Sequence, residues 1–532
     1  MPLPTKPLLI AGALSLGGCA EATAQPRPAP SPQEDRALVA HTLGRFTFGP
    51  RPGDLERVAA MGLDVWLEAQ LRAKSDPVPD PFRYATLPPL ELFEEATGQR
   101  MMAEEGGVEE AVPSAPPVRK KRNKDIRKKL KSLNFKKLAS AYTMAQLARQ
   151  ISSDDQVVEV MTDFWMNHFN VFARKGPVKF YAGHYVETAI RPHVLGRFED
   201  LVIATAQHPA MLNYLDNVKS RAPLEGRALE RRRRRDAQRM ERGQKPVRRR
   251  DLNENYAREL LELHTVGTTH SQADVVAAAR VLTGWGTADI QNGGGFAFKP
   301  KLHDRGTKTV LGRRFGPGLD EGVDMLRFLA RHPATGRLLG DKLCQRFVAD
   351  VPPPSCVERV AAAHQSSGGD IPSMLRAVYT SPSFRGSRTS KLKTPLEFLV
   401  SSLRALDARP VDDRLARVLY RLGQPTLMMP VPTGYPDVAE AWTGSSSILQ
   451  RMNLAAALGR GKLPGVELTL DRVLPLNAED LVAEVHGRVL SGRGGPHTLM
   501  VLRQEVAKAK DPRQARSVAI ALALGSPEFM RQ

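Results

Sequence analysis

The stretch Asn253-Glu254-Asn255-Tyr256-Ala257-Arg258-Glu259-Leu260-Leu261-Glu262-Leu263-His264-Thr265 has the pattern of an amphipathic helix. At 100° per residue, Glu254, Arg258 and Glu262 fall on one face, and Tyr256, Leu260 and Leu263 on the opposite face. The same periodicity recurs along most of the 532-residue chain, and aromatic residues make up only 6% of it. The sequence therefore predicts a mainly α fold built as one large multi-helix domain.

The helical pattern is interrupted around residues 289–315. Glycines are followed there by Phe296-Ala297-Phe298 and by Val310-Leu311-Gly312, which is typical of short strands joined by turns. We expect a small β-hairpin insertion in this region.

The polar face of residues 253–265 carries candidate catalytic or metal-binding carboxylates. Glu259 and Glu262 are spaced i, i+3, as the carboxylates of a metal site or of a general acid/base pair would be. Arg258 can instead join Glu254 and Glu262 in an ordinary ladder of ion pairs, and such a ladder is the commoner outcome.

Histidines could complete a polar site. His264 falls on the apolar side of its helix, as does His168 in Phe164-Trp165-Met166-Asn167-His168-Phe169, while Asp163 and Asn167 share a polar side. Each histidine alone is more often a hydrogen-bonded core residue than a ligand. If they converge with His303 and Asp304, the set would suit general acid/base chemistry or a divalent metal. The sequence identifies no cofactor.

The N-terminus resembles a lipoprotein signal. Lys6 precedes the apolar run Leu8–Leu14, which is too short to span a bilayer, and Leu16-Gly17-Gly18-Cys19 resembles a lipobox. We expect acylation of Cys19 and attachment to a cell-envelope membrane, periplasmic or outer; cleavage after Ala24 to give a secreted soluble protein is the alternative. In an oxidising compartment Cys344 and Cys356 could form a disulfide, which the sequence cannot establish.

Two windows carry nearly all of the net charge of +20. Residues 119–137 hold eleven basic residues and one acidic residue, and residues 227–250 hold twelve and three, giving +10 and +9. Both are predicted to be solvated insertions, and disorder is as reasonable as attraction to anionic lipid or envelope polymer. Export and the lack of interleaved aromatic residues argue against nucleic acid. The basic residues expected to contact such a surface are Lys120, Lys121, Arg231, Arg232, Arg233, Arg234 and Arg235.

These features suggest an organisation for the whole chain. The predicted segments are a signal peptide (1–19), a flexible tether (20–35), an N-terminal helical part (36–100), an acidic-then-basic linker (101–136), a helical core (137–218), an Arg-rich insertion (219–250) and a helical core with the hairpin (251–532).

Several segments resemble one bacterial family, catalogued as domain of unknown function 1800. The most specific is Asn253 to Gly267, in which Asn253, Glu254, Asn255, Tyr256, Arg258 and His264 match the family motif. The others are His41–Pro50, Phe164–Phe169, Val281–Trp285, His303-Asp304 with Lys308, Leu343–Asp350, Lys393–Glu397 and Pro432–Pro436, followed by Trp442 and Arg451. The resemblance implies an exported helical protein, often encoded beside a member of the uncharacterised family 1501, and no established activity. The chain departs from the family pattern at Thr268–Ser271.

Two hypotheses follow. The first is an exported, lipid-anchored helical envelope protein that binds a partner protein, such as the co-encoded family 1501 protein, or an anionic surface polymer. The alternative is an enzyme, conceivably a metal-dependent hydrolase, with a polar core site formed by Glu259, Glu262, His168, His303 and Asp304. Sequence motifs for the commonest catalytic mechanisms, such as His-Glu-x-x-His and Gly-x-Ser-x-Gly, are absent.

Overall fold

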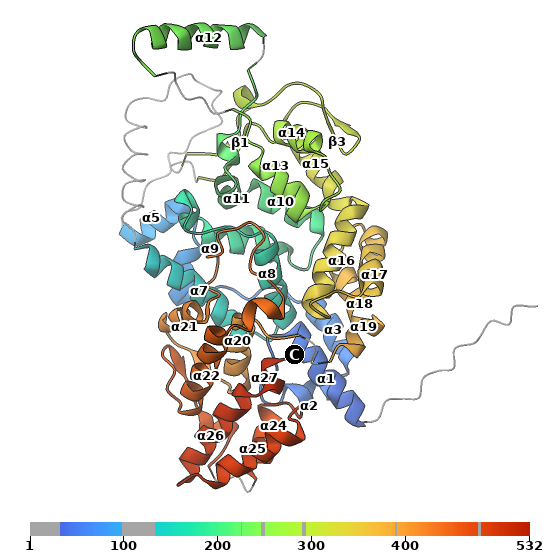
Figure 1. Ribbon diagram of the computed structural model, residues 1–532, viewed down its shortest axis with the longest axis vertical. Coiled ribbons are helices and arrows are strands. Elements are labelled where there is room, and N and C mark those ends of the chain that lie inside the picture. Colours follow the sequence, from blue (N-terminus) through green and yellow to red (C-terminus); the bar gives the residue numbers. More distant parts are fainter. Residues whose placement is uncertain are drawn as a thin grey trace, which may run out of the picture.

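The computed structural model describes residues 32–97, 134–224, 226–245, 251–289, 294–388, 391–476 and 480–532. It is mainly α, as the sequence predicts (Figure 1). Within these ranges we find no helix with both the length and the apolar character needed to span a bilayer. The longer helices are α1 (Pro32–Phe46), α2 (Asp54–Met61), α3 (Leu63–Leu71), α5 (Pro89–Thr97), α7 (Phe135–Ser152), α8 (Gln156–His168), α10 (Phe198–Gln207), α12 (Gly226–Glu241), α14 (Gln272–Val281), α15 (Leu319–Arg331), α16 (Pro333–Phe347), α17 (Pro354–Ser367), α18 (Ile371–Tyr379), α20 (Pro395–Ala405), α21 (Arg414–Leu422), α22 (Ser445–Gly459), α24 (Leu481–Arg488), α25 (Pro496–Ala507) and α26 (Pro512–Gly525).

The strands are short and form antiparallel pairs. The expected insertion around 289–315 is present, but its two apolar segments do not pair with each other. Phe296–Phe298 (β2) pairs back with Trp285–Thr287 (β1), whereas Lys308–Val310 (β3) forms a tight hairpin with Arg313–Phe315 (β4). Leu311 and Gly312 lie between β3 and β4 with positive φ angles of 47° and 78°, as a two-residue hairpin turn requires. A third pair joins Arg409–Pro410 (β5) to Val466–Glu467 (β6).

Helices α7 and α8 lie at the centre of the core. Most side chains of α7 from Leu138 to Ile151 are buried, polar ones included, so neighbouring helices surround it on several sides. The turn between the two helices is held by Arg404 of α20, which donates to the carbonyl oxygens of Ile151 (2.8 Å) and Gly49 (2.6 Å). This buried guanidinium therefore ties three distant parts of the sequence together.

A disulfide joins helices α16 and α17. Cys344 of α16 and Cys356 of α17 form a disulfide with a Cα–Cα distance of 6.2 Å. Both side chains are fully buried, so the bond lies inside the packing of α16 against α17.

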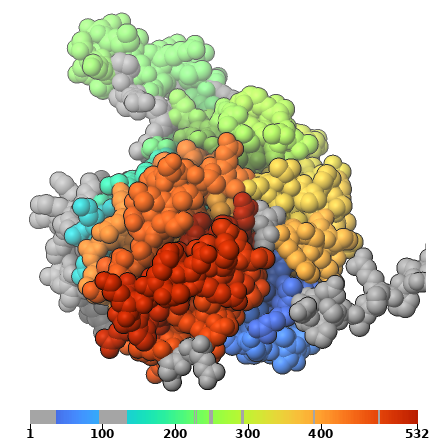
Figure 2. Space-filling view, turned by 60° about the horizontal axis from the view of Figure 1, so that its bottom comes forward, coloured from blue at the N-terminus to red at the C-terminus, as the bar shows by residue number. Residues whose placement is uncertain are grey.

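The Arg-rich insertion forms a helix. Arg231 to Arg235 all lie on α12, which projects from the top of the body in Figure 1 and stands apart from it in Figure 2. Of the two alternatives left open for this window, disorder does not hold for residues 226–241, which form a solvent-exposed helix. Oppositely charged neighbours offset the repulsion, as in the 2.7 Å contact between Arg232 and Asp236 one turn apart. Lys120, Lys121 and Cys19 lie outside the described residues.

Candidate functional site

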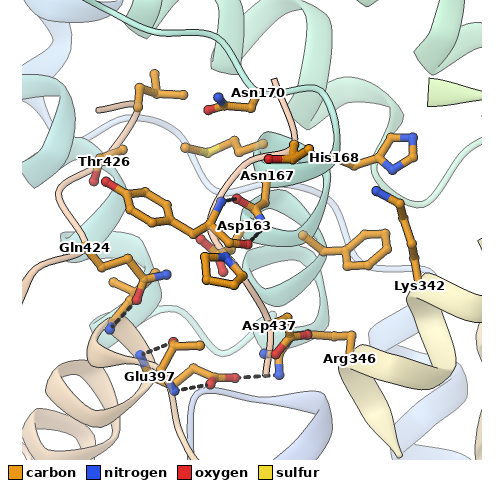
Figure 3. Close-up of a pocket in the computed structure, with 18 of the residues that line it drawn as sticks. Asp163, Asn167, His168, Asn170, Lys342, Arg346, Glu397, Gln424, Thr426 and Asp437 are labelled. Atoms are coloured by element: carbon orange, nitrogen blue, oxygen red, sulfur yellow. Dashed lines mark hydrogen bonds and ion pairs between the residues drawn. The ribbon is translucent and has the colours of Figure 1, made fainter. Parts of the chain in front are cut away.

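A polar pocket of about 280 Å³ lies between α7, α8, α16 and the start of α20 (Figure 3). A loop of residues 424–438 closes the remaining side. The pocket therefore collects side chains from segments almost 300 positions apart in the sequence. The lining residues used below are Gln150, Asp163, Asn167, His168, Asn170, Lys342, Arg346, Thr394, Glu397, Tyr435 and Asp437.

Helix α8 holds the closing loop in place. Its Asn167 side chain donates to the carbonyl oxygen of Tyr435 (2.7 Å) and accepts from the Tyr435 N–H (2.7 Å), as a neighbouring strand would. Asn170 donates to the carbonyl oxygens of Met429 and Val431 at 3.0 and 2.8 Å. Asn167 and Asn170 are therefore engaged by backbone, so they shape the pocket and leave its chemistry to other side chains.

Gly434 is required by this close approach. Its φ is 74°, and a Cβ at this position would lie 2.4 Å from Asn167 Oδ1. Any side chain would push the loop away from α8, because real Cβ contacts this short do not occur.

Asp163 lines the pocket without a polar partner among the described residues. It lies one helical turn before Asn167, and it forms no hydrogen bond or ion pair with any residue that the structure describes. Burial raises the pKa of Asp163 to about 7; the Arg346 guanidinium opposes this rise, and the Glu397 and Asp437 carboxylates add to it. Asp163 can therefore both donate and accept a proton near neutral pH.

Arg346 is committed to another carboxylate. Its guanidinium contacts Glu397 Oε1 at 2.5 Å, and Glu397 also accepts the Thr394 N–H (2.8 Å) and the Gln532 amide (2.9 Å). Although burial opposes it, Arg346 with these donors lowers the pKa of Glu397 to about 2. Arg346 thus pairs with Glu397 and also stabilises the charge of Asp163 at a distance, while the Glu397 carboxylate repels Asp163.

Asp437 completes the acidic side of the pocket. Lys391 Nζ lies 3.0 Å from its Oδ1 and 2.9 Å from Asp350 Oδ1. Burial nevertheless raises the pKa of Asp437, and the Glu397 carboxylate adds to this effect. One lysine is shared between two carboxylates, so this side of the pocket holds more acid than its cations neutralise.

The opposite side carries the Lys342 amine and the His168 imidazole, with the His264 ring behind it. Figure 3 shows the terminal nitrogen of Lys342 beside the His168 ring. Lys342 has no hydrogen bond or ion pair to any described residue, and burial lowers its pKa. His168 Nε2 donates to the carbonyl oxygen of His264 (3.1 Å), and the two rings lie 6.0 Å apart between centroids.

Both histidines are neutral. Burial lowers the pKa of His264 to about 3 and that of His168 well below its usual value. His168 Nδ1 and His264 Nε2 are buried and have no hydrogen-bond partner in the described part of the chain. The predicted convergence of these two histidines therefore occurs, and only His168 lines the pocket.

A local change of helix type places His264 beside His168. The predicted helix begins as a short α-helix, α13 (Asn255–Glu259), and continues as a π-helix, η6 (Leu260–His264). The wider turn changes the angle between successive residues, so face assignments made at 100° per residue fail beyond Glu259. Segments of π-helix recur at functional sites.

The predicted carboxylate pair is not part of the pocket. Glu262 is exposed and Glu259 half-buried, and neither lines the cavity. They lie close to one another, since burial and then the Glu262 carboxylate raise the pKa of Glu259. The alternative was a ladder of ion pairs joining Glu254, Arg258 and Glu262, and its Arg258–Glu254 pair is present at 3.3 Å.

His303 and Asp304 belong to a separate buried cluster. His303 Nδ1 donates to the Thr283 carbonyl oxygen (2.8 Å), and its Nε2 lies 3.0 Å from Glu321. Arg280 pairs with Asp304 at 2.8 Å, and Lys308 pairs with Glu321 at 2.7 Å. This cluster fastens β3 and β4 to α14 and α15, and its residues do not line the pocket with His168. The described ranges contain no group of three or more His, Cys, Asp or Glu residues suited to holding a metal ion.

The sequence contains a partial signal for this pocket. Asp163 and Asn167 were recognised as sharing a polar side of an otherwise apolar helix. Several segments that carry the family resemblance also meet at the pocket, among them Phe164–Phe169, Leu343–Asp350, Lys393–Glu397 and Pro432–Pro436. Their convergence depends on long-range packing, which local periodicity does not reveal.

Comparison with known proteins identifies a family and nothing more specific. The sequence model of the family described as "Protein of unknown function (DUF1800)" matches residues 41–531. No curated protein and no solved structure matches the chain.

Proposed function

The chain belongs to the DUF1800 family, and we propose from its pocket that it is a hydrolase-type enzyme that acts on a small polar molecule by acid–base catalysis. Asp163 is the proton-transferring group, and Lys342 with His168 contacts the opposite end of the substrate. The observation that carries the proposal is the unpaired Asp163 carboxyl, whose pKa burial raises to about 7 inside a cavity of about 280 Å³.

A purely structural role explains Asp163 poorly. Buried carboxylates in a stable core are paired and hydrogen-bonded, because an isolated charge is costly to bury. Here the ion pair of Arg346 is with Glu397, neither terminal nitrogen of Arg346 has a well-aligned hydrogen bond to a described residue, and Asp163 borders open space. A carboxyl that is half protonated near pH 7 and reaches a ligand-sized cavity has the properties of a general acid or base.

The two sides of the pocket suggest the substrate class. Lys342 offers a donor for a carbonyl or other acceptor oxygen, while Asp163 can protonate a leaving group or deprotonate water. The volume lies at the lower end of the range for small-molecule sites. We therefore favour esters, amides or glycosides of modest size.

The test is a panel of chromogenic esters, amides and glycosides assayed with the full chain and with Asp163→Asn. Asp324→Asn is the matched control, because Asp324 is an exposed aspartate in the middle of α15. We expect Asp163→Asn to lose at least about 100-fold in kcat, the usual contribution of a general acid or base, and the control to stay within about twofold. Equal activity of the two variants would refute the catalytic role.

We also propose that the protein is exported and anchored through an acylated Cys19. The buried Cys344–Cys356 disulfide supports export, because such bonds persist in oxidising compartments. Palmitate labelling of the wild type and of Cys19→Ser tests the anchor. Equal labelling of both would exclude it and leave the secreted soluble form.

A binding role for α12 is the second proposal. Arg231 to Arg235 lie on a projecting, mostly exposed helix, where they can reach an anionic lipid or polymer surface or a co-encoded family 1501 protein. Deletion of residues 227–250 should abolish salt-sensitive binding to anionic vesicles. Unchanged, salt-independent binding would refute the electrostatic account, and binding of the purified family 1501 protein can be compared in the same two proteins.

A further inference from the structure

Another cavity, of about 420 Å³, opens beside α1 and shares no lining residue with the acid–base pocket. It is bordered by α1, by the turn after α19 (Pro382–Gly386) and by the loop after α24. Its polar side chains are Arg36, His41, Arg388, Ser491 and Arg493. None of the residues lining it, all of them in described ranges, is acidic.

The nearest acids are already engaged. Glu56 contacts Arg36 at 2.7 Å on the exposed rim. Glu528, the acid that most influences Arg493, accepts hydrogen bonds from the Gly495 N–H and the Thr498 hydroxyl, each at 2.9 Å. No carboxylate of the described lining therefore competes with an anion inside the cavity.

Arg493 is held without full satisfaction of its donors. Its Nη1 makes one long bond of 3.4 Å to the Arg531 carbonyl oxygen, and its Nε has no hydrogen-bond partner in the described part of the chain. The guanidinium packs against α1 near Gly44. A buried cationic donor left in this condition is costly unless a ligand or water completes it.

His41 presents an unused ring nitrogen. Its Nε2 donates to the Phe384 carbonyl oxygen at 2.8 Å, and its ring packs on that of Phe384 with centroids 4.6 Å apart. Nε2 therefore carries the proton of the neutral ring, and Nδ1 is bare. No described residue hydrogen-bonds to Nδ1, although the side chain is only 4% exposed and lines the cavity.

We propose that this cavity binds a phosphate-type oxyanion, with Arg388 and Arg493 supplying positive charge, the Ser491 hydroxyl donating, and protonated His41 donating from Nδ1. Several guanidinium and hydroxyl donors converge here without a carboxylate, which suits a tetrahedral anion with several acceptor oxygens. The volume exceeds that of phosphate alone, so the ligand is a phosphate ester. A soluble ester and a lipid headgroup share this chemistry, and α1 begins only 13 positions after Cys19.

Proton uptake is the signature of this arrangement. Burial and then the charges of Arg45, Arg388 and Arg493 together lower the pKa of His41 to about 4, and the bond to the Phe384 carbonyl opposes them. A bound anion favours the imidazolium, so binding draws a proton onto Nδ1. Affinity should therefore rise by up to about tenfold for each pH unit lowered, beginning where His41 becomes protonated in the complex and ending where it is also protonated in the free protein.

The first experiment is calorimetric titration of the full chain with inorganic phosphate, and with sulfate, whose charge is constant from about pH 5 to about pH 8. Arg388→Gln should weaken binding about tenfold, the scale of one charge-assisted hydrogen bond. Arg385→Gln is the matched control, because Arg385 is an exposed arginine three positions away that does not line the cavity. Its affinity should stay within about twofold of the wild type.

His41→Gln tests the proton. The glutamine amide can still donate to the Phe384 carbonyl oxygen, so the fold is retained, and thermal unfolding verifies this. Sulfate affinity of this variant should be independent of pH.

The second arm separates the ligand sources. Cys19→Ser chain, freed of the predicted anchor, is mixed with vesicles of phosphatidylglycerol or phosphatidylcholine. A lipid headgroup is identified if the protein binds vesicles but not inorganic phosphate, and if Arg388→Gln weakens this binding while Arg385→Gln does not. A soluble ester is identified if the protein binds phosphate but not vesicles. Absence of saturable binding in both arms, or equal effects of Arg388→Gln and Arg385→Gln, would overturn the proposal.

Discussion

Replacing Asp163 by asparagine should make the protein more stable while removing its activity. Asparagine has nearly the same shape and cannot ionise. The pKa of Asp163 rises from an ordinary 3.8 to about 7 because the carboxylate is buried near Glu397 and Asp437. At about 1.4 kcal/mol for each pKa unit, the ionised form destabilises the native state by at most about 4 kcal/mol. Because solvent enters the pocket and screens the charge, we expect about 2 kcal/mol.

The direction in which stability changes with pH follows from the number of protons bound by the native and unfolded states. Between about pH 4 and about pH 7 the native state keeps the Asp163 proton, whereas the unfolded chain has lost it. The unfolded state thus binds fewer protons, and stability falls as the pH rises through this window. The advantage of Asp163→Asn is therefore absent below about pH 4, grows up to about pH 7 and is constant above.

Urea unfolding at about pH 5, 6, 7 and 8 measures this difference. The exposed Asp324→Asn serves again as the control and should show no such growth. A difference between Asp163→Asn and the wild type that is the same at every pH would contradict the raised pKa. A loss of stability at about pH 8 would show that the carboxylate has a partner that the reasoning omits.

Three further substitutions test interactions that hold the fold together. Gly434→Ala should destabilise the protein by about 1–3 kcal/mol and displace the 424–438 loop, because the added Cβ would lie 2.4 Å from Asn167. Gly386→Ala is the control, since an added Cβ at Gly386 meets nothing within 4 Å. Equal urea midpoints of the two variants would contradict the close approach. Cys356→Ser should cost about 2–4 kcal/mol, and the difference should vanish when dithiothreitol reduces the wild type; persistence of a difference would attribute it to packing. Arg191→Met should cost about 3–5 kcal/mol of stability, because Glu159, fully buried and 2.5 Å from Arg191, loses its partner. The double variant Arg191→Met/Glu159→Gln should recover part of this stability. If it recovers none, the unpaired Glu159 charge is not the cause.

Local signals predicted the fold well where they were self-contained. Ser271 and Asp274 form the reciprocal capping box that opens α14. The similar pattern at Ser153 and Gln156 opens α8 without such a box, because the Gln156 amide donates to the carbonyl oxygens of Gln150 and Ser153 and its oxygen accepts the Phe48 N–H. The helix was predictable from periodicity, and the tertiary use of its first residue was not.

The site was predicted only in part for a related reason. His168 and His264 were recognised as apolar-face histidines that could meet, and they do, because a π-helical turn carries His264 toward α8. Glu259 and Glu262 were chosen for spacing on one helix. The pocket draws instead on Asp163 and Lys342, which belong to helices 179 positions apart in the sequence, so no spacing rule relates them.

The ionic interior can be weighed against a simpler core. Burying a charged pair such as Arg346 and Glu397 costs desolvation that apolar residues of the same volume would avoid. If stability alone explained the polar interior, each buried ion would at least have a partner, as Arg191 has Glu159 at 2.5 Å. Asp163 has no hydrogen bond or ion pair in the described part of the chain, and burial makes its charge costly although Arg346 partly offsets that cost. A carboxyl that lowers stability near neutral pH and faces a cavity is better explained by proton transfer to a ligand than by support of the fold, and the opposite effects expected of Asp163→Asn on stability and activity distinguish the two.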